Sequence, residues 1–176
     1  MRVIGGEFRS RPLKSLPGLD VRPTPDRLRE ALFNVLAPRI AGTVFADLYA
    51  GTGAVGIEAL SRGASRAIFI EQNRAAVNVL RQNLKSLDLE ARGQVLQGRA
   101  TALLGGIRAD IVFLDPPYAL EGEYLTSLTK LGEQQAKLVI VQHDVRLKLE
   151  PAYGGLQQTR VLRQGDNCLS FYAAIN

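Results

Sequence analysis

The sequence predicts an α/β fold with a mostly parallel sheet of seven strands, helices on both faces and an antiparallel hairpin at its C-terminal end. Two observations carry this prediction. From residue 43 onward, amphipathic segments alternate with short, nearly continuous apolar ones, which are 43–48, 67–71, 93–97, 110–114 and 137–142. Buried strands of this kind, separated by helices, are typical of a parallel sheet covered on both sides. Residues 158–164 and 168–175 are then rich in β-formers and are joined by Gly165-Asp166-Asn167, a hairpin signal.

The helices are expected between these strands, with one more before them. Those between the strands cover residues 54–62, 73–87, 100–105 and 121–133. In the earlier helix, Thr24 is expected to cap the first turn, Pro25 fits its first position and Asp26 favours its positive end. Its apolar face is expected to consist of Leu28, Ala31, Leu32, Val35 and Leu36, and Pro38 to close it.

The first 40 residues differ in charge from the rest. They hold +4 of the net charge of +5. Residues 2–9 are expected to begin a strand or hairpin interrupted by Gly5-Gly6, and residues 10–22 to form a basic, mobile loop. We expect residues 1–40 to be an extension packed on a domain of residues 41–176, in one compact unit. The charge fits either a polyanion-binding arm or a solvated surface that is merely basic.

Composition narrows the class of protein. The chain has 176 residues, 46% hydrophobic and 22% charged, as in an ordinary globular domain. No apolar run approaches the ~20 residues that span a bilayer, and the N-terminus lacks the apolar stretch of a signal peptide, so we expect a cytoplasmic protein without membrane contact. The single cysteine, Cys168, excludes an internal disulfide and is expected in the core. No metal-ligand cluster or Ser-His-Asp set is visible, so no metal is expected.

A glycine-rich turn follows the first strand after residue 43. Gly51, Gly53 and Gly56 match G-x-G-x-x-G, in which the first two glycines allow a tight turn close to a ligand and the third allows close helix-to-strand contact. Glu71 ends the next strand, where its carboxylate could bind both hydroxyls of a ribose. Dinucleotide oxidoreductases and S-adenosylmethionine enzymes share this pattern, so the turn alone leaves both open.

Asp47 favours S-adenosylmethionine. A carboxylate beside the turn would repel a pyrophosphate but attract the cationic sulfonium and amino groups of S-adenosylmethionine. The alternative is that Asp47 only caps the turn. After the third strand, where many methyltransferases place an acid near the adenine, this chain has Arg99, so backbone groups are expected to read the adenine there. The cofactor-binding residues predicted are Asp47, Tyr49, Ala50, Gly51, Thr52, Gly53, Glu71, Gln72, Arg99 and Ala100.

The tetrapeptide Asp115-Pro116-Pro117-Tyr118 follows a buried strand and is the predicted catalytic motif. The prolines fix the backbone and remove two donors, which leaves carbonyls beside the Asp. The carboxylate of Asp115 and the carbonyl of Pro116 can accept the two N–H bonds of a planar amino group and orient its lone pair for methyl transfer. Tyr118 offers a ring on which a splayed base can stack. The alternatives are an ordinary Pro-Pro turn and, for the lone His143, a structural rather than a catalytic role.

On these motifs the chain resembles the bacterial 16S ribosomal RNA guanine-N2 methyltransferases of the RsmD type. The likeness is carried by residues 2–13 (RVIGGEFRSRPL), 22–34 (RPTPDRLREALFN), 47–53 (DLYAGTG) and 115–118 (DPPY). It implies a Rossmann-like class I methyltransferase that uses S-adenosyl-L-methionine to methylate guanine 966 of 16S rRNA, in the small subunit or its assembly intermediate. We expect a monomer. The RNA is expected to contact Arg9, Arg11, Lys14, Arg22, Pro23 and Thr24.

Two other functions stay open at this point. Asp-Pro-Pro-Tyr does not choose the base, so the chain could methylate the N6 amino group of adenine in RNA or DNA. The absence of a target-recognition domain in 176 residues argues against sequence-specific DNA modification. A non-catalytic RNA-binding assembly factor could also keep this fold, but an altered Asp115 or a broken glycine turn would be expected there, and neither is seen.

Overall fold

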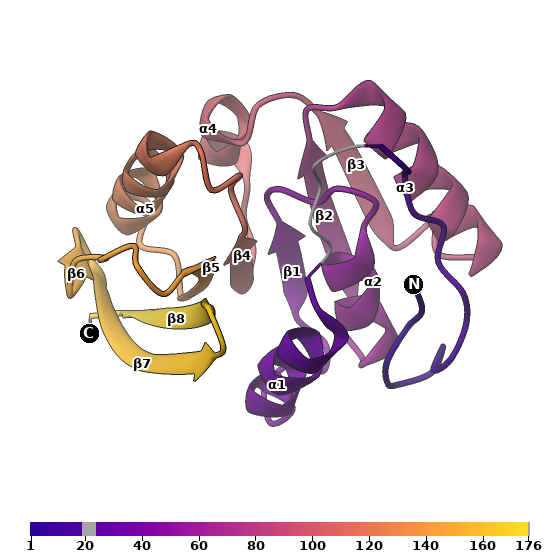
Figure 1. Cartoon of the computed structure of the whole chain (residues 1–176), viewed down its shortest axis with the longest axis horizontal. Coiled ribbons are helices and arrows are strands. Elements are labelled where there is room, and N and C mark those ends of the chain that lie inside the picture. Colours follow the sequence, from indigo (N-terminus) through magenta and orange to yellow (C-terminus); the bar gives the residue numbers. More distant parts are fainter. Residues whose placement is uncertain (19–23, 176) are drawn as a thin grey trace.

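A computed structural model describes residues 1–18 and 24–175 and shows one mixed sheet with helices on both faces (Figure 1). The strands follow the order β3-β2-β1-β4-β5-β8-β7-β6. Their bounds are β1 Val44–Asp47, β2 Arg66–Glu71, β3 Gly93–Gln97, β4 Ile111–Leu114, β5 Leu138–Asp144, β6 Ala152–Tyr153, β7 Leu156–Gln164 and β8 Asn167–Ala174. The first five strands run parallel, and β8 joins β5 antiparallel as part of the C-terminal hairpin. The α/β prediction is confirmed.

The sheet has one strand more than the sequence predicted. Strand β6 comprises only Ala152 and Tyr153, and it pairs antiparallel with the start of β7 at the outer edge. Two residues are too few to show the alternation that reveals a strand in a sequence. The short strand is held by Tyr153, which is buried and packs edge-on against Tyr172 of β8 at a ring-centroid distance of 5.6 Å.

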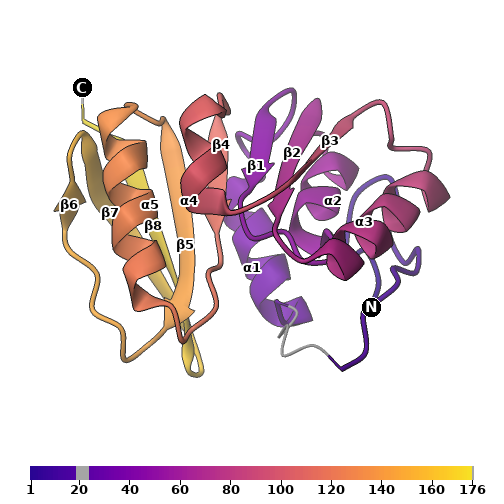
Figure 2. The same cartoon turned by 90° about the horizontal axis from the view of Figure 1, so that it is seen from above.

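The helices form two layers that bury alternate residues of the strands. They are α1 Asp26–Leu36, α2 Ala54–Ser61, α3 Arg74–Ser86, α4 Ala100–Leu103, which continues into the 3₁₀ turn Leu104–Gly106, and α5 Glu121–Glu133. In β1, Phe45 joins the core under α1, α2 and α3, whereas the next residue, Ala46, joins the core under α4 and α5. Strands β1–β3 lie at one end of the molecule, and α5 with the hairpin lies at the other (Figure 2). No helix within the described residues is long and apolar enough to cross a membrane.

The N-terminal segment forms a short hairpin, which is one of the two forms that the sequence predicted for residues 2–9, and the backbone N–H of Val3 donates across it to the carbonyl of Arg11 at 3.0 Å. Within residues 1–14 the only β-pairing that the structure shows is an isolated bridge between Arg2 and Pro12. Val3 and Leu13 are buried in the core with α1. The carboxylate of the buried Glu58 accepts the backbone N–H groups at positions 4 and 5, each at 3.1 Å. Glu58 of α2 thus ties the hairpin to the domain, and Val3 and Leu13 complete the core.

The start of α1 also differs from the prediction. The cap residue is Pro25, and no side chain caps the helix. Thr24 is buried, and its hydroxyl donates instead to Oε1 of Gln142 at the end of β5, at 3.1 Å. A long-range partner 118 residues away has displaced the local one. Of the predicted apolar face, Leu28, Leu32 and Leu36 are fully buried, whereas Ala31 and Val35 are only partly buried.

Candidate active site

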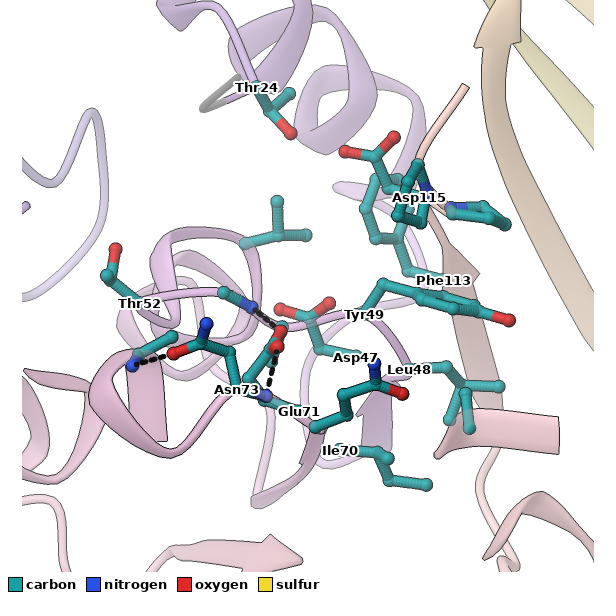
Figure 3. Close-up of a pocket in the computed structure, with 18 of the residues that line it drawn as sticks. Thr24, Asp47, Leu48, Tyr49, Thr52, Ile70, Glu71, Asn73, Phe113 and Asp115 are labelled. Carbon is teal, nitrogen blue, oxygen red and sulfur yellow. Dashed lines mark hydrogen bonds between the residues drawn. The ribbon is translucent and has the colours of Figure 1, made fainter. Parts of the chain in front are cut away.

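A cavity of about 550 Å³ opens at the carboxyl ends of β1, β2, β4 and β5 (Figure 3). This edge is where ligands bind in open α/β sheets, because the loops that follow the parallel strands converge there. The cavity brings together most of the residues predicted from the sequence, namely Thr24, Asp47, Tyr49, Ala50, Gly51, Thr52, Glu71, Gln72, Arg99, Ala100, Asp115, Pro116, Pro117 and Tyr118. Residues as far apart in the sequence as Thr24 and Tyr118, which are 94 positions apart, therefore line the same cavity.

Some predicted residues lie elsewhere. Gly53 does not line the cavity but starts α2 with a φ of 94°, and a Cβ at that position would lie 2.2 Å from Leu80. Its role is to close the turn that presents Gly51 and Thr52. The predicted RNA contacts Arg9, Arg11 and Lys14 lie on the exposed surface of the N-terminal segment. The predicted contacts Arg22 and Pro23 lie outside the described residues.

The glycine turn is tied to the next strand by Glu71. One carboxylate oxygen accepts the backbone N–H of Gly51 at 2.7 Å, and the other accepts that of Asn73 at 2.9 Å. Asn73 in turn caps α3 by accepting the backbone N–H of Ala76. Figure 3 shows these bonds at one end of the cavity. Each carboxylate oxygen has a second lone pair, so Glu71 holds the turn and still offers acceptors to a ligand.

Asp47 ends β1 and is almost fully buried. Its Oδ2 accepts the backbone N–H of Gly56 in α2 at 3.1 Å, so Asp47 has the turn-holding contact of the alternative interpretation. The same residue lines the cavity. Burial raises the pKa of Asp47 to about 7, the bond from Gly56 opposes that rise, and the charge of Glu71 adds to it. An uncompensated acid on the wall of a cavity favours a cationic occupant.

Asp115 lies directly after β4 on the same wall. Burial raises its pKa to about 8, and the nearby charge of Asp47 adds to the rise. Within residues 1–18 and 24–175, neither acid forms an ion pair. Two like acids that share a cavity oppose each other's ionisation, and a cation between them would restore it.

Two tyrosines hold the tetrapeptide of residues 115–118 in place. Tyr124 lies on the buried face of α5, and its hydroxyl donates to the carbonyl of Pro116 at 3.2 Å and lies 3.4 Å from the carbonyl of Gln142. The hydroxyl of Tyr118 donates to Oδ1 of Asn167 in β8 at 2.8 Å, which fixes its ring beside the cavity. Sequence reasoning missed Tyr124, because a tyrosine on the apolar face of a helix carries no functional signal.

An acid from α5 was also missed. Glu123 lines the cavity, accepts the hydroxyl of Tyr49 at 2.6 Å, and pairs with the guanidinium of Arg99 at 3.4 Å. Arg99 is largely exposed, and its side chain is directed to this acid. Its backbone begins α4 beside Ala100 on the cavity wall. An acid therefore does lie on this side of the cavity, and it comes from a helix 24 residues further along the chain than Arg99.

His143 and Cys168 have structural roles. His143 does not line the cavity, and its ring contacts Oγ of Ser170 at 2.7 Å and the carbonyl of Asp144 at 2.9 Å. Burial lowers the pKa of His143, so the ring is held neutral. Cys168 is buried opposite His143 in the β5–β8 pairing, as the sequence predicted. In the part of the chain that the structure describes, no cluster of His, Cys, Asp and Glu could hold a metal ion.

Comparisons with known proteins agree with this architecture. A family model described as Conserved hypothetical protein 95 matches residues 1–173. YlbH of Bacillus subtilis, provisionally named an rRNA methyltransferase, is 36% identical over 183 residues that cover 98% of each chain. Ribosomal RNA small subunit methyltransferase D of Escherichia coli is 45% identical over 122 residues, which cover 67% of this chain and 60% of that protein.

Solved structures give the same result. A provisionally named methyltransferase from Escherichia coli, yhhF, has a TM-score of 0.88 and 35% identity, covering 99% of this chain and 97% of its own. An RNA methyltransferase from Salinibacter ruber, solved with S-adenosyl-L-homocysteine, has a TM-score of 0.67 at 19% identity, covers 87% of this chain and 94% of its own, and supports the fold alone. Because the family model spans nearly the whole chain, this protein belongs to the Conserved hypothetical protein 95 family, that of the RsmD-type rRNA methyltransferases.

Proposed function

We propose that this protein transfers a methyl group from S-adenosyl-L-methionine to the exocyclic N2 amino group of a guanine in 16S rRNA. The substrate is the small ribosomal subunit or its assembly intermediate, and the protein acts in the cytoplasm as a monomer. The observation that carries the proposal is the position of Asp115, which faces the same cavity as Asp47 and Glu71. An acceptor for an amino group thus stands beside acids suited to a cationic cofactor.

The cavity residues fit S-adenosylmethionine. Glu71 retains acceptor capacity for ribose hydroxyls, and the turn at Gly51 allows close approach of the ligand. The apolar side chain of Ile70 also lines the cavity and suits the adenine ring. Asp47 and Asp115 have raised pKa values that a sulfonium and an ammonium group would lower, so the cofactor's charge and the protein's acids stabilise each other. When bound, the cofactor supplies an electrophilic methyl group on sulfur.

The tetrapeptide of residues 115–118 binds the amino group that receives the methyl group. The ionised carboxylate of Asp115 and the second lone pair of the Pro116 carbonyl accept the N–H bonds of the amino group, since Tyr124 occupies only one lone pair. The nitrogen lone pair is then free to form the N–C bond, while the bond between the methyl carbon and sulfur would break and leave its electron pair on sulfur. As that bond forms, the nitrogen gains positive charge and must release a proton. Once the sulfonium charge that lowers the pKa of Asp115 has been lost in the transfer, burial again favours the protonated acid, so the carboxylate is a suitable proton acceptor.

The basic N-terminal segment supports an RNA substrate. Arg9, Arg11 and Lys14 are exposed, and none pairs with an acidic residue in the described part of the chain. The next residues, Ser15 and Leu16, line the cavity. Phosphates bound by this segment would therefore lie next to the position proposed for the base.

Two experiments test the proposal. Calorimetry with S-adenosylmethionine and NAD should give heat only with the first, because Asp47 would repel a pyrophosphate. Affinity for NAD without affinity for S-adenosylmethionine would overturn the cofactor assignment. Tritiated methyl transfer to small subunits, naked rRNA and duplex DNA, followed by nucleoside analysis, should give N2-methylguanine from small subunits. N6-methyladenine as the product would show that the protein methylates adenine instead of guanine. The absence of a methylated product with every substrate would favour a non-catalytic assembly factor.

A further inference from the structure

One buried side chain on the acceptor side of the cavity has unused hydrogen-bonding capacity. Gln142 is 3% exposed and lines the cavity. Its Oε1 accepts the hydroxyl of Thr24 at 3.1 Å. No group within residues 1–18 and 24–175 accepts a hydrogen bond from its amide nitrogen, Nε2. Gln142 is not among the described residues with fully buried, unpartnered polar atoms, so its amide nitrogen reaches the cavity and can donate to an acceptor on a ligand.

The sheet places this amide beside Asp115. Leu114 and Val141 are register partners in the parallel pair β4–β5. The residues that follow them, Asp115 and Gln142, therefore stand at the same level on neighbouring strands. Both also lie two residues after side chains of the same core, Phe113 and Ile140, so they project from the same face of the sheet.

Thr24 holds the amide in one orientation. Its buried hydroxyl occupies Oε1, which leaves Nε2 as the end of the amide that is free to donate. Figure 3 shows the side chains of Thr24 and Asp115 turned toward each other at the end of the cavity away from Glu71. An acceptor and a donor are thus fixed side by side where the base is proposed to enter.

From this juxtaposition we infer that Gln142, oriented by Thr24, donates a hydrogen bond to O6 of the target guanine while Asp115 accepts its N2 amino group. Neighbouring strands lie about 4.8 Å apart, a spacing that matches the two ends of a purine's Watson–Crick edge rather than two adjacent ring atoms. Guanine carries an amino group and a carbonyl at those ends. Adenine, placed with its amino group on Asp115, would present only a C–H to Gln142 and leave the donor unpaired.

The inference rests on the proposed function and adds to it an explanation of how guanine is distinguished from adenine, because the tetrapeptide alone does not distinguish these bases. It is tested with small subunits whose rRNA carries guanine, or 2-aminopurine, at the methylated position. 2-Aminopurine keeps the amino group and lacks O6. The wild-type protein should prefer guanine by about tenfold or more in kcat/KM, the effect of one hydrogen bond to a buried donor.

The variant Gln142→Leu should lose activity on guanine by the same factor and leave the 2-aminopurine rate unchanged, so that the preference disappears. Thr24→Val should reduce the preference in the same direction, because the amide is then free to rotate. Gln157→Leu, an exposed position on β7, is the matched control and should behave as wild type.

An unchanged preference in Gln142→Leu, with an unchanged melting temperature, would overturn the inference. Should that variant fail to fold, an unchanged preference in Thr24→Val would overturn it. In both cases wild-type methylation of guanine would still stand, so the proposed function would survive. A wild-type protein that does not methylate guanine would overturn both.

Discussion

Glu71 accepts the backbone N–H of Gly51 at 2.7 Å, which joins the end of β2 to a turn 20 residues earlier in the chain. We therefore expect Glu71→Ala to act twice, by removing acceptors from the cofactor and by releasing the turn. Its affinity for S-adenosylmethionine should fall by about 1–3 kcal/mol, the range for hydrogen bonds to a charged group. Calorimetry measures the affinity, and the melting temperature of the unliganded variant should also fall. Glu90→Ala, at an exposed position, is the control; full affinity in Glu71→Ala would contradict the assignment.

Asp115→Ala should remove turnover and leave cofactor affinity nearly unchanged, because the carboxylate is assigned to the amino group of the substrate. We expect a loss of at least about 100-fold in single-turnover methylation at saturating cofactor, as for other preorganised polar groups. Asp115→Asn keeps one acceptor oxygen but cannot take up the proton, and it should be similarly slow. A variant that kept a tenth of the wild-type rate would show that Asp115 does not hold the nucleophile.

The raised pKa of Asp115 predicts a specific effect of pH on stability. Between the ordinary value of 3.8 and about 8, the unfolded chain has this acid ionised while the folded protein keeps it protonated. The folded state then binds more protons, so this acid's contribution to the free energy of unfolding falls as pH rises through that window. Asp115→Asn should be as stable as wild type near pH 4 and more stable at pH 8 to 9. Urea unfolding of both proteins across this range is the measurement, and parallel curves would contradict it.

Tyr124→Phe should slow methyl transfer without weakening cofactor binding. The lost hydroxyl donates to the Pro116 carbonyl in a buried site, so the tetrapeptide becomes less firmly placed and unfolding becomes easier by about 1 kcal/mol. The expected signature is a lower kcat with the KM for S-adenosylmethionine unchanged. Tyr153→Phe removes the hydroxyl of another buried tyrosine, at β6, and should leave kcat alone. Equal decreases of kcat in both variants would show that Tyr124 contributes only to the stability of the protein.

Charge reversal at Arg9, Arg11 and Lys14 should weaken RNA binding and reduce the slope of log affinity against log salt, because fewer counterions are released. The melting temperature should change little, because the segment is held mainly by backbone bonds to Glu58 and by buried Val3. Filter binding between 50 and 200 mM salt provides the measurement. The control reverses three exposed arginines on other surfaces, Arg108, Arg160 and Arg163. If the slope of log affinity against log salt is unchanged in the variant of Arg9, Arg11 and Lys14, RNA binds to another surface of the protein.

Most of the fold and the centre of the site could be predicted because their signals are local. The apolar strand over Ile111–Leu114, the glycine turn after Asp47 and the tetrapeptide at Asp115 each occupy a few consecutive residues. Because the strands alternate with helices and run parallel, their carboxyl ends lie at the same edge of the sheet, regardless of the loop sequences. For the same reason Glu71 could be assigned to the cavity from its position at the end of a strand.

The sequence alone thus determined the α/β class, the order of elements along the chain except for the two-residue strand β6, and which residues stand at the ends of the parallel strands. The tertiary structure decided which distant side chains complete that chemistry. Thr24 was predicted to cap its own helix and instead bonds to Gln142, and Tyr124 and Glu123 reach the site from α5. The physical reason is that a buried polar group takes whichever partner the packed chain offers. That partner lies 118 residues away for Thr24, a distance over which no local pattern extends.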